Sequence, residues 1–136
     1  MQPRRVEVFF YGLFMDEDLL LEKSVTPENR RIASLNNFRL IIGNRATLVP
    51  FAGATVYGVL FSLTHQEIDQ LYSDPSVSEY RPEAVTAISN GEAVAALCFN
   101  LPIVPSENKR NSEYATKLKA LAERIGLPQA YVKSIV

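Results

Sequence analysis

The chain has 136 residues, of which 47% are hydrophobic and 21% are charged; this composition is typical of a globular domain and excludes a disordered polar chain. Fourteen Lys and Arg against fifteen Asp and Glu give a formal net charge of -1, so the sequence offers no broad basic field for a nucleic-acid backbone. We therefore expect one domain spanning residues 1–136 that does not bind nucleic acid.

The sequence contains no feature that predicts a membrane segment, a disulfide or a metal cluster. No stretch reaches the roughly 20 apolar residues that a membrane span requires, and the apolar run near the start is interrupted by Glu7 and followed by three acids at 16–18. Cys98 is the single cysteine and lies in an apolar segment, which predicts a core position. His65 is the single histidine and is expected at the surface. We expect a cytoplasmic protein with no bound metal.

The first third of the chain predicts a strand, a short helix and a polar connection. Residues 6–11 are rich in β-forming side chains and predict a buried strand that Gly12 ends. Asp16 can then cap a short helix with acids in its first turn. The stretch 24–34 is polar, contains a proline and predicts a connection.

Two further strands are predicted before the middle of the chain. The second covers residues 38–42 and the third covers 54–63. Between them, residues 48–50 predict a loop that ends near Gly53. Gly58 lies inside the third strand, where a glycine indicates a bulge or a close backbone contact.

A helix and a hairpin follow. Thr64 and Glu67 have the spacing of a capping box, in which each side chain pairs with the backbone of the other residue, and predict a helix start. Asn90-Gly91 supplies the positive φ angles of a tight turn, so residues 83–89 and 92–100 predict a β-hairpin.

The end of the chain predicts a loop and two helical segments. Residues 102–110 predict the loop, Ser112 can cap a helix that Gly126 ends, and Pro128 can start a final turn. The strands and helices do not alternate regularly, and at least one strand pair is antiparallel. The sequence therefore predicts an α+β fold, with a mixed sheet or small barrel and packed helices, rather than a Rossmann fold.

Three segments in this order carry a resemblance to a known family: residues 9–15 (FFYGLFM), residues 56–64 (VYGVLFSLT) with Tyr80 after a short helix, and Tyr114 with residues 123–131 (ERIGLPQAY). Together they resemble the γ-glutamylcyclotransferase-like family, also described as AIG2-like. The resemblance implies a small mixed β-barrel flanked by helices and a cofactor-free reaction of the acyltransferase or lyase type. In that reaction the α-amine of a γ-glutamyl group attacks its own γ-carbonyl, releasing 5-oxoproline and an amine or amino acid.

The turn Tyr11-Gly12-Leu13-Phe14 is the candidate substrate-binding turn. Exposed backbone N–H groups can receive a carboxylate or an oxyanion, and Gly12 lets the backbone come close to a ligand. The family usually has a hydroxyl residue at the position of Leu13 and, in one branch, an amide at Phe14, so a polar contact to substrate is missing here. The alternative is that the turn simply ends a strand.

Asp74 is the candidate catalytic base. The family places a glutamate six or seven residues before the tyrosine that Tyr80 matches, and Asp74 lies six residues before it. A carboxylate can deprotonate an ammonium group, but this side chain is one methylene shorter, and a misplacement near 1 Å can cost on the order of 10²-fold in rate. The alternative is an Asx turn before Pro75. Glu79 and Glu83 are reserve carboxylates.

Two tyrosines and an arginine complete the predicted site. Tyr80 and Tyr114 match tyrosines that line the family's pocket, where their hydroxyls could bind the substrate or orient the base; Tyr114 could equally start the apolar face of its helix. Arg45 is either a solvated loop residue, which we favour, or a carboxylate contact. Two functions stay open: a γ-glutamyl cyclotransferase with Asp74 as base, or a family member without catalysis that binds a small anionic ligand or a protein partner.

Overall fold

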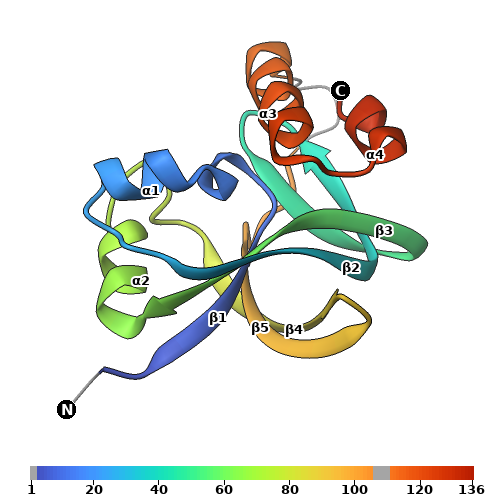
Figure 1. Cartoon of the computed structure of the whole chain (residues 1–136). Coiled ribbons are helices and arrows are strands. Elements are labelled where there is room, and N and C mark those ends of the chain that lie inside the picture. The colour runs from blue at the N-terminus through green and yellow to red at the C-terminus, as the bar shows by residue number, and fades with distance from the viewer. Residues whose placement is uncertain (1–2, 106–110) are drawn as a thin grey trace.

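The computed structural model describes residues 3–105 and 111–136. Its strands form a curved sheet, with two helices on one side and two on another (Figure 1). The elements in chain order are β1 (Arg5–Phe10), the 3-10 helix η1 (Leu13–Met15), α1 (Glu17–Glu22), β2 (Glu28–Ile42), β3 (Ala46–Thr64), α2 (His65–Leu71), β4 (Arg81–Ser89), β5 (Glu92–Asn100), α3 (Ser112–Ile125) and α4 (Gln129–Ser134).

The five strands close into a barrel in the order β1-β3-β2-β4-β5. The pairs β1–β3, β2–β3, β2–β4 and β4–β5 are antiparallel, whereas β1 and β5 run parallel through the pair Val8 and Leu97. The sheet is therefore mixed, and the predicted α+β fold with a small mixed barrel and packed helices is confirmed. Closure also removes the exposed strand edges that an open sheet would leave.

The alternation of side chains along β1 divides the core into two parts. Phe9 and Tyr11, which are two positions apart, lie inside the barrel. They pack with residues from the other four strands, including Cys98. Val8 and Phe10 point the opposite way and pack against the helices. Side chains of a strand alternate between its two faces, so the apolar stretch of residues 8–11 reflects burial on both faces. Cys98 is fully buried, as predicted, and burial raises the pKa of its thiol to about 12.

Gly58 is required by a close approach between β3 and β1. A Cβ atom at this position would lie 2.2 Å from the carbonyl oxygen of Phe10, a distance at which the two strands could not pair. The close backbone contact expected from the sequence is therefore confirmed.

Two expected connections are strand instead. β2 begins at Glu28, inside the stretch predicted as a connection, because its backbone pairs with β3 from there on. Its polar side chains also meet charges on β1, on the far side of β3; Arg31, for example, pairs with Glu7. Residues 48–50, predicted as a loop, belong to β3. Pro50 pairs with Phe38 beside a register shift in β2, where a missing N–H group is tolerated.

The helix and turn signals are largely confirmed. Asp16 caps α1, and Thr64 with Glu67 forms the predicted capping box at α2. Asn90 and Gly91 have positive φ and join β4 to β5. One correction concerns α3: its cap is Asn111 and not Ser112, because the Asn111 side chain accepts the Tyr114 N–H. Of the loop predicted over 102–110, residues 106–110 lie outside the described residues.

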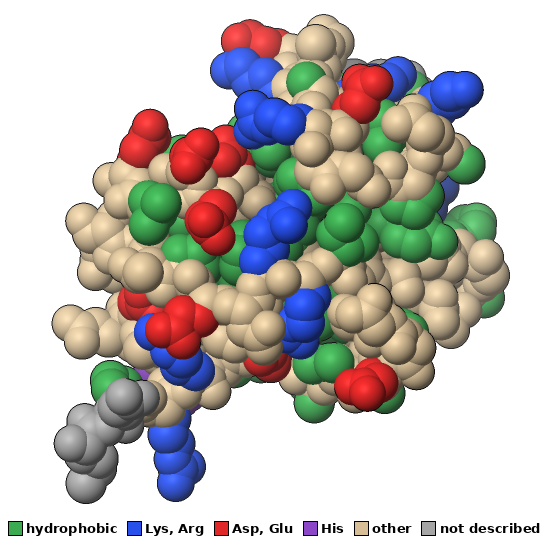
Figure 2. All heavy atoms as spheres, viewed as in Figure 1, with side chains coloured by type: hydrophobic (Ala, Val, Ile, Leu, Met, Phe, Trp, Pro, Cys, Tyr) green, Lys and Arg blue, Asp and Glu red, His purple; other side chains and the backbone are tan. Residues whose placement is uncertain are grey.

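The surface in Figure 2 mixes both signs of charge with hydrophobic side chains. Lys and Arg stand among Asp and Glu on this face, as a net charge of -1 suggests. Across residues 3–105 and 111–136, no helix combines the length and apolar character needed to cross a bilayer.

Candidate functional site

A cavity of about 280 Å³ opens beside the end of β1. Its walls come from η1 and α1, the turn before β3, the loop between α2 and β4, β5 and α3. Eight of its sixteen lining residues are aromatic: Phe9, Phe10, Tyr11, Phe14, Tyr72, Tyr80, Phe99 and Tyr114. The other eight are Gly12, Leu13, Leu19, Lys23, Arg45, Ala46, Ser76 and Val77. This cavity is of the size that holds one small molecule.

The predicted substrate-binding turn forms one wall of the cavity. All four of its residues, 11–14, line the space. The turn is closed by the Met15 N–H, which donates to the Gly12 carbonyl at 3.0 Å. A Cβ on Gly12 would lie 2.7 Å from the hydroxyl oxygen of Tyr114, so a larger residue here would displace that hydroxyl. The sequence therefore brings the backbone of this turn up to a side chain from α3.

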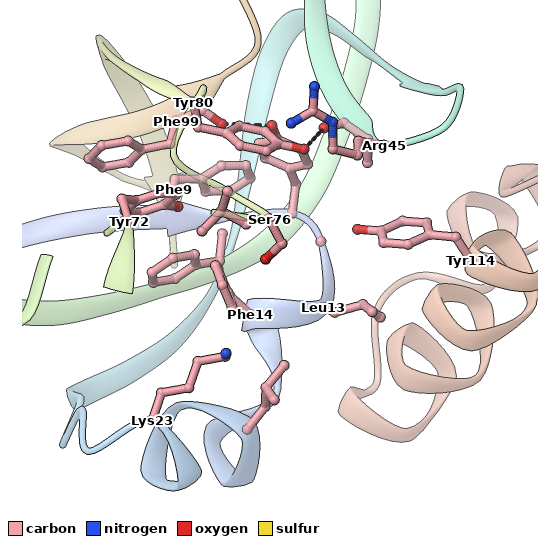
Figure 3. A pocket seen from close by; sticks show the side chains of 16 residues that line it. Phe9, Leu13, Phe14, Lys23, Arg45, Tyr72, Ser76, Tyr80, Phe99 and Tyr114 are labelled. Carbon is pink, nitrogen blue, oxygen red and sulfur yellow. Dashed lines mark hydrogen bonds between the residues drawn. The ribbon is translucent and has the colours of Figure 1, made fainter. Parts of the chain in front are cut away.

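Tyr114 points its hydroxyl from the first turn of α3 into the space beside Gly12 and Leu13 (Figure 3). Burial raises the pKa of this phenol, while hydrogen bonding with the Leu13 backbone acts in the opposite direction. The phenol is therefore neutral near pH 7 and can donate or accept a hydrogen bond. Of the tyrosine hydroxyls in the predicted site, the Tyr114 hydroxyl is the one that faces the turn 11–14.

The hydroxyls of Tyr80 and Tyr11 are engaged within the protein. Tyr80 donates to the Ala46 carbonyl at 2.5 Å, and burial raises its pKa well above the ordinary range. Tyr11 donates to the Phe99 carbonyl at 2.7 Å and to Asn100 Oδ1 at 2.9 Å. Both residues line the cavity as predicted, and they present ring surface to it.

Aromatic side chains continue from these rings across the cavity (Figure 3). Tyr72 stacks on Phe99 with ring centroids 4.0 Å apart and an interplanar angle of 13°. Phe14 meets the edge of Tyr72 at 6.0 Å. This packing keeps the floor of the cavity rigid and apolar, which strengthens any charge interaction made above it.

Two cations line the cavity: Lys23, which the sequence did not indicate, and Arg45, which was expected at the solvated surface with a carboxylate contact as the alternative. Lys23 follows α1, and its Nζ lies 3.8 Å from Asp74 Oδ2. Arg45 lies in the turn before β3, 3.1 Å from Glu79 Oε2 and with its guanidinium carbon 5.9 Å from the centre of the Tyr80 ring. No local signal distinguishes Lys23 from a solvated helix-end lysine; Arg45 had been considered as a carboxylate contact and lies on the cavity wall.

Asp74 lies outside the cavity, on its rim. Its Oδ1 accepts hydrogen bonds from the Ser76 backbone N–H at 2.9 Å and from the Ser76 hydroxyl at 2.7 Å, which is the Asx turn considered as the alternative. These hydrogen bonds and the nearby Lys23 lower the pKa of Asp74. Its side chain is 44% exposed. In this arrangement the carboxylate is a weak proton acceptor, and Asp74 is not among the residues that line the cavity with the Gly12 turn.

The reserve carboxylates are also directed elsewhere. Glu79 pairs with Arg45 and is 67% exposed, and Glu83 accepts a hydrogen bond from the Asn100 amide at 2.7 Å.

The charged side chains that line the cavity are cations. Among the described lining residues there is neither Asp nor Glu. Within the part of the chain that the structure describes, no three His, Cys, Asp or Glu side chains are grouped to hold a metal ion. The cavity is therefore suited to receive an anion.

Comparisons with known proteins identify the fold and the family. The model of the family described as "Gamma-glutamyl cyclotransferase, AIG2-like" matches residues 8–117. Among solved structures, one titled "Gamma-glutamyl cyclotransferase" superposes with a TM-score of 0.78 at 18% identity, covering 97% of this chain and 88% of that chain.

Two further solved structures have the same fold. An uncharacterized protein from Homo sapiens gives a TM-score of 0.77 at 21% identity, covering 98% of this chain and 89% of its own. YkqA from Bacillus subtilis gives 0.77 at 22% identity, covering 95% of this chain and 52% of its own. No curated protein matches the sequence. At these identities the solved structures establish the fold alone.

Proposed function

The chain belongs to the γ-glutamyl cyclotransferase, AIG2-like family, and we propose that its cavity binds a small organic anion of the γ-glutamyl type. The observation that carries this proposal is the charge of the lining: Lys23 and Arg45 face the cavity, and the described lining residues include no carboxylate. The family supplies the chemical class, since its reaction acts on γ-glutamyl groups.

Arg45 and Tyr114 are the side chains best suited to hold the ligand. A guanidinium group binds a carboxylate through two parallel hydrogen bonds, and the neutral Tyr114 hydroxyl can add another beside the turn. The aromatic floor presents apolar surface beside these contacts, and a hydrogen bond to an anion next to apolar surface is worth more than one made in open water.

Cyclotransfer is a second candidate function, because both partners of Asp74 line the cavity. Ser76 and Lys23 are lining residues, so the Asp74 carboxylate lies one side chain away from the bound ligand. To act as base it must release Ser76 and turn inward. It would then take a proton from the ligand's ammonium group; the freed amine would attack the γ-carbonyl carbon, the amide C–N bond would break, and a proton would pass to the leaving nitrogen.

A panel of γ-glutamyl amino acids and γ-glutamyl amines tests both functions. Binding is measured by calorimetry, and 5-oxoproline is assayed in the same samples. We expect binding without 5-oxoproline, and we expect Arg45→Met to weaken binding by about tenfold, the value of one charge-assisted contact. Lys133→Met, which removes an exposed lysine on α4, is the matched control and should leave binding unchanged.

The outcomes separate the two candidates. Production of 5-oxoproline that is abolished by Asp74→Asn, with ligand binding intact, would establish cyclotransfer; asparagine keeps the Asx turn and removes the basic oxygen. Absence of binding by every compound in the panel would overturn the proposed function.

A further inference from the structure

Lys23 and Arg45 lie on opposite sides of the aromatic floor. In Figure 3, Lys23 reaches in from the end of α1 below the rings of Phe14 and Tyr72, and Arg45 stands beyond Tyr80 on the other side. The two cations come from segments that are separated by β2, and both line the cavity. A ligand with one anionic group can meet only one of them, and the other would keep its partner from the protein.

Each cation is held by an acid that a ligand can replace. Asp74 and Glu79, the partners of Lys23 and Arg45, have exposed side chains, at 44% and 67%. Ion pairs between such exposed side chains contribute little to stability. A ligand carboxylate above the aromatic floor would meet the same cations with less competing water. Both acids lie on the loop between α2 and β4, so ligand binding would also release the two ion pairs that hold this loop.

We propose that the ligand carries two anionic groups and a large apolar side chain, with one anionic group bound by Arg45 and the other by Lys23. This inference rests on the proposed anion-binding function and narrows it. Among γ-glutamyl compounds it selects γ-glutamyl amino acids over γ-glutamyl amines, since the amino acid part provides the second carboxylate. The rings of Phe14, Tyr72 and Phe99 favour an aromatic or branched side chain on the amino acid part.

Three compounds that differ in one group each test the inference. γ-Glutamylphenylalanine has both carboxylates and the ring, γ-glutamylphenethylamide lacks the second carboxylate, and γ-glutamylglycine lacks the ring. We expect the first to bind about tenfold more tightly than the second, corresponding to one charged contact. We expect it to bind at least about tenfold more tightly than the third, because a buried phenyl ring removes a large apolar surface from water.

Variants assign the second carboxylate to Lys23. Lys23→Met keeps the approximate length of the side chain and should abolish the preference for γ-glutamylphenylalanine over the phenethylamide, because the second carboxylate then has no cation to meet. Lys133→Met should preserve the preference. Asp74→Asn removes the competitor for Lys23 and keeps the Asx turn, so it should tighten γ-glutamylphenylalanine binding severalfold and leave the phenethylamide unaffected.

The results distinguish this inference from the function on which it rests. If the phenethylamide binds as tightly as γ-glutamylphenylalanine, or if the preference survives Lys23→Met, the second anionic group is refuted and the proposed anion binding stands. If γ-glutamylglycine binds as tightly as γ-glutamylphenylalanine, the apolar part of the inference is refuted. If none of the three compounds binds, both the inference and the proposed function are wrong.

Discussion

Gly12 and Tyr114 fit together as a pair at the point where the turn after β1 meets α3. The absence of a Cβ on Gly12 leaves room for the Tyr114 hydroxyl, which would otherwise be 2.7 Å from that atom. The hydroxyl also hydrogen-bonds with the Leu13 backbone. A ligand carboxylate that approaches this turn therefore meets a hydroxyl as well as backbone N–H groups. The turn and α3 are parts of one binding surface.

Replacement of Gly12 by alanine tests this fit. The added methyl group must displace the Tyr114 hydroxyl, and we expect the free energy of unfolding to fall by about 1 kcal/mol, a usual cost of overpacking. Urea denaturation measures the change. In the Tyr114→Phe background the displaced atom is absent, so Gly12→Ala should cost clearly less there. An equal cost in both backgrounds would show that the methyl group clashes with something else.

The sequence indicated some of the residues of the pocket but not others. The turn 11–14, Tyr80 and Tyr114 lie in motifs that the resemblance aligns, and the structure brings them around one cavity; their roles in binding stay proposals. Lys23 could not be found, because its position depends on how α1 packs and its immediate sequence carries no motif. For Asp74 the spacing led to a segment that borders the cavity, but spacing does not determine side-chain direction, and two hydrogen bonds from Ser76 hold the carboxylate on the rim.

Glu67 joins α2 to the segment before β2. One carboxylate oxygen accepts the Thr64 N–H at 2.9 Å in the capping box, and the other accepts the Thr26 N–H at 2.7 Å. Arg5 adds a positive charge at 3.8 Å. Burial raises the pKa of Glu67, but the hydrogen bonds and Arg5 together outweigh burial and lower it below its ordinary value of 4.5. The carboxylate form is therefore stabilised by folding.

This pKa shift predicts how Glu67→Gln behaves with pH. A carboxyl group whose pKa is lowered by folding adds stability above its unfolded pKa, and this stability is lost as the pH falls through the lower, folded pKa. The variant should therefore be less stable than the original chain at pH 7, by about 1 kcal/mol, and the difference should shrink below about pH 4.5. Urea denaturation at pH 7 and pH 3 measures it. Asp69→Asn on the exposed side of α2 is the control; a gap for Glu67→Gln that is constant with pH would contradict the assignment.

At the scale of elements, the sequence identified segments better than it identified their lengths. β2 and β3 form one long hairpin that bends where Asn37 and Gly53 have positive φ. The side chain of Asn37 accepts the Gly53 N–H at 3.1 Å, which holds the bend without ending either strand. Proline, glycine and asparagine ordinarily indicate loops, and here they mark a bend within paired strands. Pairing with a distant partner is a tertiary effect that local signals do not report.

Asn100 links four strands of the barrel behind the cavity. Its Oδ1 accepts the Tyr11 hydroxyl after β1 and the Leu48 N–H of β3, and its Nδ2 donates to Glu83 of β4, while Asn100 itself ends β5. Its side chain is nearly fully buried. A buried amide with partners on all sides specifies one arrangement of strands, because other arrangements would leave polar atoms unpaired.

The sequence predicted the class of the fold, but it did not predict which contacts close the barrel. The absence of regular strand-helix alternation and the hairpin signal led to a mixed barrel with packed helices. The parallel contact of Val8 with Leu97 that closes it has no local signature in either strand. The polar link through Asn100 was also invisible, since one asparagine at the end of a strand usually indicates the start of a loop.

Asn100→Asp tests whether this link holds the barrel. Aspartate keeps an oxygen for Tyr11 and Leu48, but its second oxygen faces Glu83 Oε1 where the Nδ2 donor stood at 2.7 Å. Two carboxylates at this distance repel and lose a hydrogen bond, so we expect the free energy of unfolding at pH 7 to fall by about 2 kcal/mol.

A second substitution, Glu83→Gln, is the control for this prediction. Added to Asn100→Asp, it supplies a new amide donor and should recover most of the loss. Glu83→Gln alone should change stability by less than about 1 kcal/mol, since its oxygen can still accept the Asn100 amide. Urea denaturation of the three variants measures these differences. A double variant no more stable than Asn100→Asp would mean that the strands are held together without this polar link.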